Sequence, residues 1–457
     1  MPLVGISAAL YELGDYEACI HTATKAIELL KADSEDEAES NIQKLNQRIE
    51  KATVHVYEVS EGEKRQVRHT LLGAVPRYRP SMLGASEYFT VGHDVVTSLF
   101  GDDGIFEKYS PQSKTVSFFF GGVGDARNMY QTISVINELE LSGKLPRRRY
   151  HFTLNDIHKA ALARDLIICI LLDDLSKLDE NSDESLMILN TIFFIFVSTM
   201  MPKYAFDHLN LIIDRAVRSL RLGHQPLGWL YLHETDIPSY LAALNHWKKE
   251  ASNVLVNSRI MRRVSIAMAR KLQSGFSDPT MRPSQTEELL YDEAALLLPS
   301  QKVMHRHDPI MLQLIEKHAS RHDQNFEVFR QHVETYWHWN TTLMDQDLYD
   351  HTVESPHDQF DVGFNPFEEY NHFPYDEVST KPKKSGRLFE HLAPFFADAA
   401  KALKQLGERL QVEAALGDYT VVAERLQYGL YEGQGAKEIR PEHFPRLYDR
   451  VHLSNVP

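Results

Sequence analysis

The sequence predicts an α/β protein built on an open parallel sheet that is interrupted by a long helical segment. Two stretches alternate apolar strands with helices, over residues 115–172 and again over 410–453. The residues between them, 181–404, carry apolar side chains at helical spacing over long runs. Because strand–helix–strand order gives a right-handed parallel unit, we expect both stretches to contribute strands to one sheet.

Composition and cysteine content indicate an ordinary globular protein of a reducing compartment. The 457 residues allow two or three domains, and the hydrophobic share of 43% and charged share of 25% are usual for globular chains. Cys19 and Cys169 are too few for a disulfide framework or a multi-cysteine zinc module. No basic leader opens the chain, and the apolar run 186–201 is too short to span a bilayer. We expect a cytoplasmic protein with no membrane contact.

Negative charge is concentrated in two segments. Residues 1–60 hold 11 acids and 5 bases, and residues 341–378 hold 10 acids and no lysine or arginine. These segments account for the net charge of −15, so the rest of the chain is close to neutral. A nucleic-acid binder needs a basic face, which this distribution does not supply. We instead expect protein partners to bind the two acidic segments.

Residues 8–30 predict a helical hairpin with a glycine–aspartate turn. After the turn, Cys19, Ala23 and Ala26 recur at helical spacing, which resembles the second half of a tetratricopeptide repeat. A single repeat cannot bury its own faces, so the hairpin either belongs to a longer array or packs on the next domain. An ordinary helical hairpin is the alternative. Residues 1–60 form this first predicted domain.

Residues 61–180 form the first part of the predicted sheet domain. The run from Val116 to Phe120 shows no polar alternation, which is typical of a strand buried on both faces. A helix over 126–141, a strand over 150–154 and a helix over 157–172 follow it.

Residues 181–404 are predicted to be an all-helical insertion. The expected helices span 185–201, 204–221, 238–272, 284–298, 308–335 and 388–408. Before the last of these, the acidic and aromatic stretch 361–377 is expected to be a long surface loop. Residues 405–457 form the second part of the sheet domain, with a strand, a helix over 420–428 and a strand over 450–453.

The four predicted strands end in glycine, acidic or amide residues. In strand order these are Gly121, Gly122, Gly124 and Asp125, with Arg127 just behind; Asn155 and Asp156; Gly417 and Asp418; and Ser454 and Asn455. Open parallel sheets bind ligands beyond the carboxyl ends of their strands. Glycines let the backbone approach a ligand, and an acid after the second strand can accept hydrogen bonds from ribose hydroxyls. The pattern predicts a cofactor site at this edge.

This layout resembles that of the S-adenosylmethionine-dependent methyltransferases, whose sheet is Rossmann-like. The resemblance places the glycine loop at "FFFGGVGDA", the ribose acid at Asp156, the adenine acid at Asp418 and the catalytic-face strand at "LSNVP". It implies S-adenosylmethionine as a possible cofactor. The chain departs from the pattern in two places, since no acid leads the loop and Ala126 stands where a third glycine is usual.

The motifs "GGVGDARNMYQTI", "FTLNDIHKAALARDLIICILL" and "YDRVHLSNVP" are similar to a further family, the domain of unknown function 4470. That family occurs in fungal proteins, often with a MYND zinc finger or helical repeats, and is related to the N-terminal part of dynein axonemal assembly factor three. It implies a methyltransferase-like fold without an established activity. Two cysteines cannot build a MYND finger, and we expect the sheet to be incomplete where the sequence stops at Pro457.

Structural roles compete with ligand roles at the predicted site. Asp125 could cap the following helix with Arg127 paired to an acid such as Asp156, while Asp156 and Arg164 could be a cap and a surface ion. Our leading hypothesis is a protein-interaction or assembly module on a methyltransferase-like fold. The alternatives are an active S-adenosylmethionine-dependent methyltransferase of unknown substrate and a non-catalytic nucleotide-sensing module.

Overall fold

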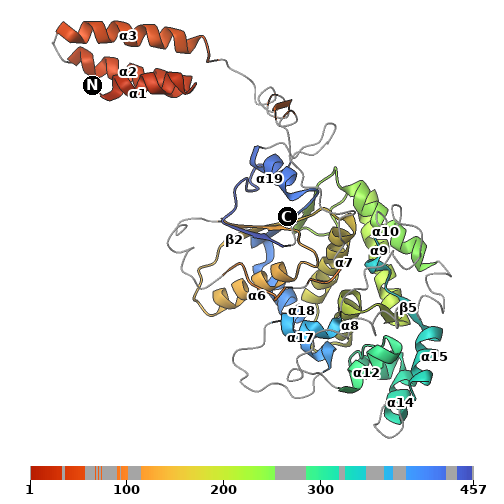
Figure 1. Cartoon of the computed structure of the whole chain (residues 1–457). Coiled ribbons are helices and arrows are strands. Elements are labelled where there is room, and N and C mark those ends of the chain that lie inside the picture. The colour runs from red at the N-terminus through yellow and green to blue at the C-terminus, as the bar shows by residue number, and fades with distance from the viewer. Residues whose placement is uncertain are drawn as a thin grey trace. The chain divides into compact units, whose positions relative to one another are not determined.

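The computed structural model describes most of the chain. The described residues are 2–32, 36–56, 67, 70–71, 74, 90–92, 94–100, 115–252, 285–318, 325–345, 365–373, 387–428 and 440–454. They belong to two compact units, residues 1–78 and 79–457, each of which is considered by itself (Figure 1). No helix in these described ranges is long and apolar enough to cross a membrane.

The first unit is a helical hairpin followed by a third helix, which confirms the predicted hairpin. It consists of α1 (Pro2–Glu12), α2 (Tyr16–Ala32) and α3 (Asp36–Thr53). Its small core contains Ala23, Ala26, Ile27, Leu30, Ala38 and Leu45. Arg48 of α3 ties the helices together, since its guanidinium donates to the Val4 carbonyl (3.0 Å) and to the Ser7 hydroxyl (2.6 Å).

The second unit is built on a five-stranded, all-parallel sheet. Its strands are β1 (Thr115–Gly121), β2 (Arg149–Asp156), β4 (Leu230–Leu232), β6 (Leu410–Leu416) and β7 (Arg450–Leu453), in the order β4-β6-β2-β1-β7. β1 and β2 pair over their whole length, and β7 pairs with the other side of β1. Strands from both predicted stretches therefore meet in one sheet.

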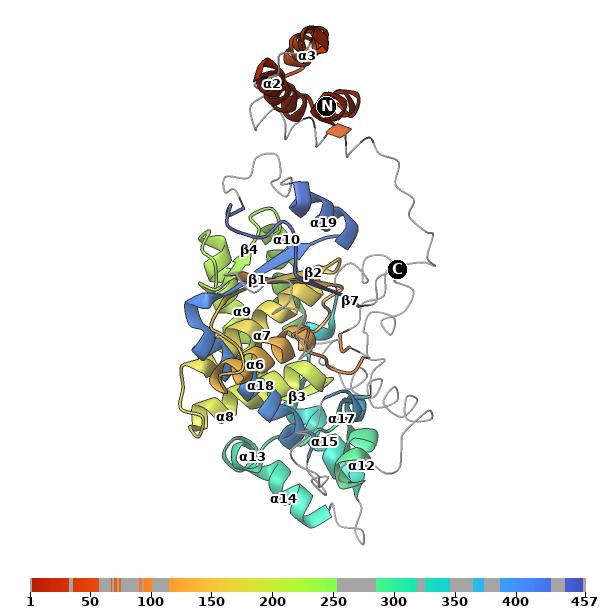
Figure 2. The same cartoon turned by 90° about the vertical axis from the view of Figure 1, so that its left-hand side faces the viewer.

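The described residues of the second unit form a set of α-helices, some of which cover the two faces of this sheet. They are α6 (Arg127–Leu141), α7 (Lys159–Ser176), α8 (Asp183–Val197), α9 (Lys203–Arg221), α10 (Ile237–Ala251), α12 (Gln285–Ala294), α13 (Gln301–His307), α14 (Pro309–His318), α15 (Phe326–Tyr336), α17 (Glu369–His372), α18 (Leu388–Leu406) and α19 (Tyr419–Tyr428). Viewed along the sheet edge, α6, α7 and α18 lie on one side and α19 on the other (Figure 2).

The prediction that residues 181–404 are all helical is wrong at three places. β4 belongs to the main sheet, where it pairs with β6. β3 (Met200–Pro202) and β5 (Trp337–Trp339) pair with each other in a small antiparallel sheet. A strand of three residues is shorter than one helical turn, so periodicity in the sequence cannot separate it from a helix end.

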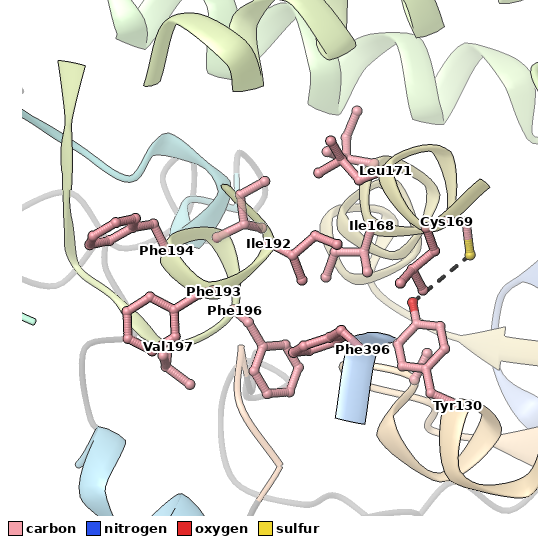
Figure 3. Packing of buried hydrophobic residues seen from close by; sticks show 14 of the residues in the cluster. Tyr130, Ile168, Cys169, Leu171, Ile192, Phe193, Phe194, Phe196, Val197 and Phe396 are labelled. Atoms are coloured by element: carbon pink, nitrogen blue, oxygen red, sulfur yellow. Dashed lines mark hydrogen bonds between the residues drawn. The ribbon is translucent and has the colours of Figure 1, made fainter. Parts of the chain in front are cut away.

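The face of the sheet towards α6, α7 and α18 is apolar. Phe118 of β1 and Phe152 of β2 enter the main core, where their rings stack with centroids 4.7 Å apart. Figure 3 shows the adjoining region, in which the Tyr130 hydroxyl points at Sγ of Cys169 at 3.9 Å. Both groups are buried, and burial raises the pKa of each. This packing makes α7 the central helix of the unit.

The opposite face of the sheet carries a buried polar network around Glu413. The Glu413 carboxylate is fully buried and accepts hydrogen bonds from Nε (2.6 Å) and Nη2 (2.8 Å) of Arg440. It also lies 3.1 Å from Nε2 of His151 and 2.8 Å from Nε2 of His233. Burial acts to raise the pKa of Glu413, but the hydrogen bonds from Arg440 and the two histidines hold the pKa well below its usual range. Glu413 is therefore a buried anion on this face of the sheet.

Glu413→Gln should destabilise the second unit by about 3–5 kcal/mol, because it leaves the Arg440 guanidinium without its carboxylate. Urea unfolding of the full chain, followed by circular dichroism, measures the change. Glu408→Gln is the control, since Glu408 is exposed and its replacement should shift the free energy by less than about 0.5 kcal/mol. Equal midpoints for the two variants would contradict the expected role of Glu413.

Candidate functional site

The candidate site is the edge of the sheet at which four parallel strands end. β6, β2, β1 and β7 are neighbours in that order, so the predicted strand ends lie side by side. Gly121 at the end of β1 pairs with Asn155 of β2 on one side and with Leu453 of β7 on the other. The strand order reverses at β1, because β2 and β6 extend the sheet one way and β7 the other. Open parallel sheets bind ligands at such a reversal.

The corner between β1 and α6 requires left-handed backbone at three residues. Gly122, Gly124 and Ala126 have φ values of 65°, 60° and 55°. Glycine adopts such angles without strain, whereas an alanine rarely does. Ala126 precedes α6 and has no side chain to cap it, but the Asp125 carboxylate accepts a hydrogen bond from the backbone N–H of Arg127, the first residue of the helix (3.3 Å). The turn itself therefore accounts for the two glycines.

Asp125 and Arg127 form a buried ion pair. Nε of Arg127 lies 2.9 Å from each carboxylate oxygen of Asp125, and the guanidinium also contacts Glu369 at 3.1 and 3.2 Å. Arg127 thus pairs with Asp125 and Glu369 and not with Asp156. Burial acts to raise the pKa of Asp125, but Arg127 and the Gly92 N–H (2.9 Å) hold the pKa below its usual value. Both members of the pair are occupied by internal contacts.

A second buried arginine, Arg164, lies next to this pair. Its guanidinium donates to the carbonyls of Ile195 and Phe196, each at 2.8 Å, and to the carbonyl of Thr90. The guanidinium carbons of Arg127 and Arg164 lie 5.5 and 5.9 Å from the centre of the Phe196 ring. Arg164 is 2% exposed, so the prediction that it is a surface ion is wrong.

Asn155 and Asp156 fasten the end of β2 to the adjoining loops. Asp156 accepts hydrogen bonds from the backbone N–H of Gly124 (3.1 Å) and of His158 (2.8 Å), one on each carboxylate oxygen. Asn155 donates from Nδ2 to the carbonyls of Ala415 (2.9 Å) and Gly417 (2.8 Å). Burial raises the pKa of Asp156. The residue that precedes α7 is His158, and Asp156 accepts from the N–H of that residue and not from an N–H within the helix.

The ends of β6 and β7 are also engaged in internal contacts. Asp418 accepts hydrogen bonds from the N–H (2.9 Å) and the hydroxyl of Thr420, at the start of α19. A Cβ on Gly121 would lie 2.7 Å from a methyl carbon of Leu453, so the Leu453 side chain fills the space over the end of β1. Asn455 lies outside the described residues.

Glu369 is the residue of this edge that sequence reasoning missed. It lies in the stretch 361–377, which was expected to be a surface loop. In the described part of that stretch, Phe367, Tyr370 and Phe373 are buried together with Glu369, so the prediction is wrong there. The signal was the alternation of acids with aromatic residues in "FEEYNHF", which suits a segment that brings a carboxylate and several rings to a buried cation.

Two features of this edge restrict access for a cofactor such as S-adenosylmethionine. Asp156 is buried, and each of its carboxylate oxygens already accepts one backbone N–H. Leu453 occupies the space that Gly121 leaves open. Within the part of the chain that the structure describes, no group of three histidine, cysteine or acidic side chains is arranged to hold a metal ion.

A family match supports part of the predicted resemblance. Residues 91–201 match a family described as Domain of unknown function (DUF4470). The matched segment contains both buried arginines, Arg127 and Arg164, and the acids Asp125 and Asp156. No curated protein and no solved structure matches the chain.

Arg127→Met should destabilise the second unit by about 3–5 kcal/mol, because Asp125 and Glu369 then remain buried without their common cation. The measurement is the urea midpoint of the full chain. Arg147→Met serves as the control, since Arg147 is exposed and should change the free energy by less than about 0.5 kcal/mol. A stable Arg127→Met variant would show that the buried ion pair is dispensable.

Proposed function

We propose that this protein acts as a protein-interaction or assembly module whose second unit is a Rossmann-like, methyltransferase-like scaffold. The observation that carries the proposal is that the polar side chains at the carboxyl ends of the strands are bound to other groups of the protein. Asp125 is bound to Arg127, Asp156 to two backbone amides and Asn155 to two carbonyls. These contacts hold the edge of the sheet in place. Such an edge suits a rigid scaffold better than a site that has to bind and release a small ligand.

The order of the strands supports the Rossmann-like assignment. From β1 the sheet extends through β2 and β6 on one side and to β7 on the other, so its order reverses at β1, as in doubly wound sheets. It departs from the simple 3-2-1-4 order, because β4 precedes β6 in the chain and yet lies outside it. Proteins that share a fold often differ in function, because function depends on the residues of a site and not on the strand order. A Rossmann-like sheet is therefore compatible with a function that lies elsewhere on the molecule.

The first unit is the better candidate for the partner surface. Residues 1–60 carry a net charge of −6, and their helical hairpin is tetratricopeptide-like. In the acidic segment 341–378, by contrast, two of the three described acids, Asp345 and Glu369, are buried and paired with His158 and Arg127. Those two carboxylates are therefore not presented to a partner.

A second candidate function is S-adenosylmethionine binding, either in a methyltransferase or in a nucleotide sensor. Gly124 favours it, because a Cβ at that position would meet open space and its φ of 60° suits a loop that approaches a ligand. Asp156 stands at the strand end where a ribose acid is expected.

Calorimetric titration of the full chain with S-adenosylmethionine and S-adenosylhomocysteine separates the two functions. We expect no heat of binding at millimolar ligand, because Asp156 is buried and the Leu453 side chain fills the space over the end of β1. Heat that appears with the wild type and disappears with Asp156→Ala would overturn the proposal in favour of a cofactor site at this edge. Heat that persists in Asp156→Ala would place a ligand elsewhere.

Deletion of residues 1–60 should remove the partners of the protein. The full chain and the shortened chain are each used as bait in an extract of the source organism, and the captured proteins are compared by mass spectrometry. The shortened chain should keep the urea transition of the second unit, which shows that its fold is intact. Capture of the same proteins by both baits would contradict a partner surface in the first unit.

A further inference from the structure

The outward side of α1 is an apolar stripe. The stripe consists of Pro2, Ile6, Ala9 and Leu13, which follow one another at intervals of four, three and four residues. This spacing places them on one side of α1, with Leu13 just after its last residue. All four are exposed, and Ile6 and Leu13 keep 48% and 80% of their accessible surface. Gly5 lies beside the stripe and is also exposed. The small side chains of Gly5 and Ala9 allow another helix to come close.

The inward side of α1 is already used within the first unit. Leu3 and Val4 pack against its core, and Ser7 is buried, donating to the Val4 carbonyl (3.0 Å) and accepting from Arg48. A helix that is apolar on all sides is normally covered on all sides. The outer stripe of α1 therefore has the character of an interface.

The charge around the stripe selects the kind of partner. Glu12, Asp15 and Glu17 are exposed next to Leu13, and residues 1–60 carry a net charge of −6. A second copy of this chain would bring like charges together, and an anionic membrane surface would be repelled as well. A basic helix gains attraction from the same charges.

We propose that the stripe of α1 binds a basic amphipathic helix of another protein. The apolar side of that helix lies on Ile6, Ala9 and Leu13, and its lysines or arginines face Glu12 and the acids that follow. This inference rests on the proposed interaction function and names its surface and partner class. One helix crossing buries less than the roughly 800 Å² per partner of stable complexes, so the complex exchanges rapidly.

The probes are two synthetic peptides of about 18 residues, or five helical turns, that share one leucine–alanine face. Their polar faces carry lysine in one peptide and glutamate in the other. Fluorescence anisotropy with the full chain at physiological salt measures binding. The lysine peptide should bind and the glutamate peptide should not.

The double variant Ile6→Glu/Leu13→Glu should weaken binding of the lysine peptide about tenfold or more, since it removes both large side chains of the stripe. The variant also adds two negative charges, so purely electrostatic binding would strengthen. Gln43→Glu/Gln47→Glu is the matched control, because it adds the same two charges at exposed polar positions of α3. It should leave binding unchanged or tighter. Circular dichroism checks that both variants stay helical.

Equal binding by the wild type and by Ile6→Glu/Leu13→Glu would overturn the proposal, as would an equal loss in the Gln43→Glu/Gln47→Glu control. A wild-type dimer in sedimentation that Ile6→Glu/Leu13→Glu abolishes would overturn it in favour of a second copy. If deletion of residues 1–60 removes partners while Ile6→Glu/Leu13→Glu still binds the lysine peptide, the interaction function stands and this surface fails.

Discussion

The buried pair of Asp125 and Arg127 is the interaction on which the architecture of the second unit depends. A guanidinium removed from water needs carboxylates close by, and Arg127 obtains one from its own corner and another from Glu369, 242 residues later. A Cβ on Gly92 would lie 3.0 Å from Nε of Arg127, so the backbone of Gly92 packs closely against the guanidinium. One buried cation thus fixes segments from three distant parts of the chain at the end of β1.

The two faces of the sheet are organised around buried charges of opposite sign. Next to the apolar face, Arg127 is held by two carboxylates. On the other face, the carboxylate of Glu413 is held by Arg440 and two histidines. The first network binds the segment 365–373 to the start of α6, and the second binds the segment 440–449 to β6. Because such networks are costly to break, they hold the strand ends and the late segments together.

The elements with strong local patterns were predicted closely. The strand expected over 116–120 is β1, the helix expected over 126–141 is α6, and the strand expected over 450–453 is β7. Long apolar runs and regular 3.6-residue spacing identify such elements without any knowledge of their neighbours. The elements and contacts that the sequence analysis missed have no such local pattern. Strands of three residues carry no period, and the burial of Glu369 follows from a contact with Arg127 that no local window contains.

The sequence by itself determined the four longer strands and the helices next to them, that these strands are parallel, and that glycines and acids gather at their carboxyl ends. Those properties follow from local spacing and from the rule that parallel strands end at one edge. Only the tertiary structure decided what the gathered residues do. Whether Asp156 meets a ribose or the amide of Gly124, and whether Arg127 meets solvent or two carboxylates, depends on groups brought together by folding, because burial gives each charge the partners that happen to surround it.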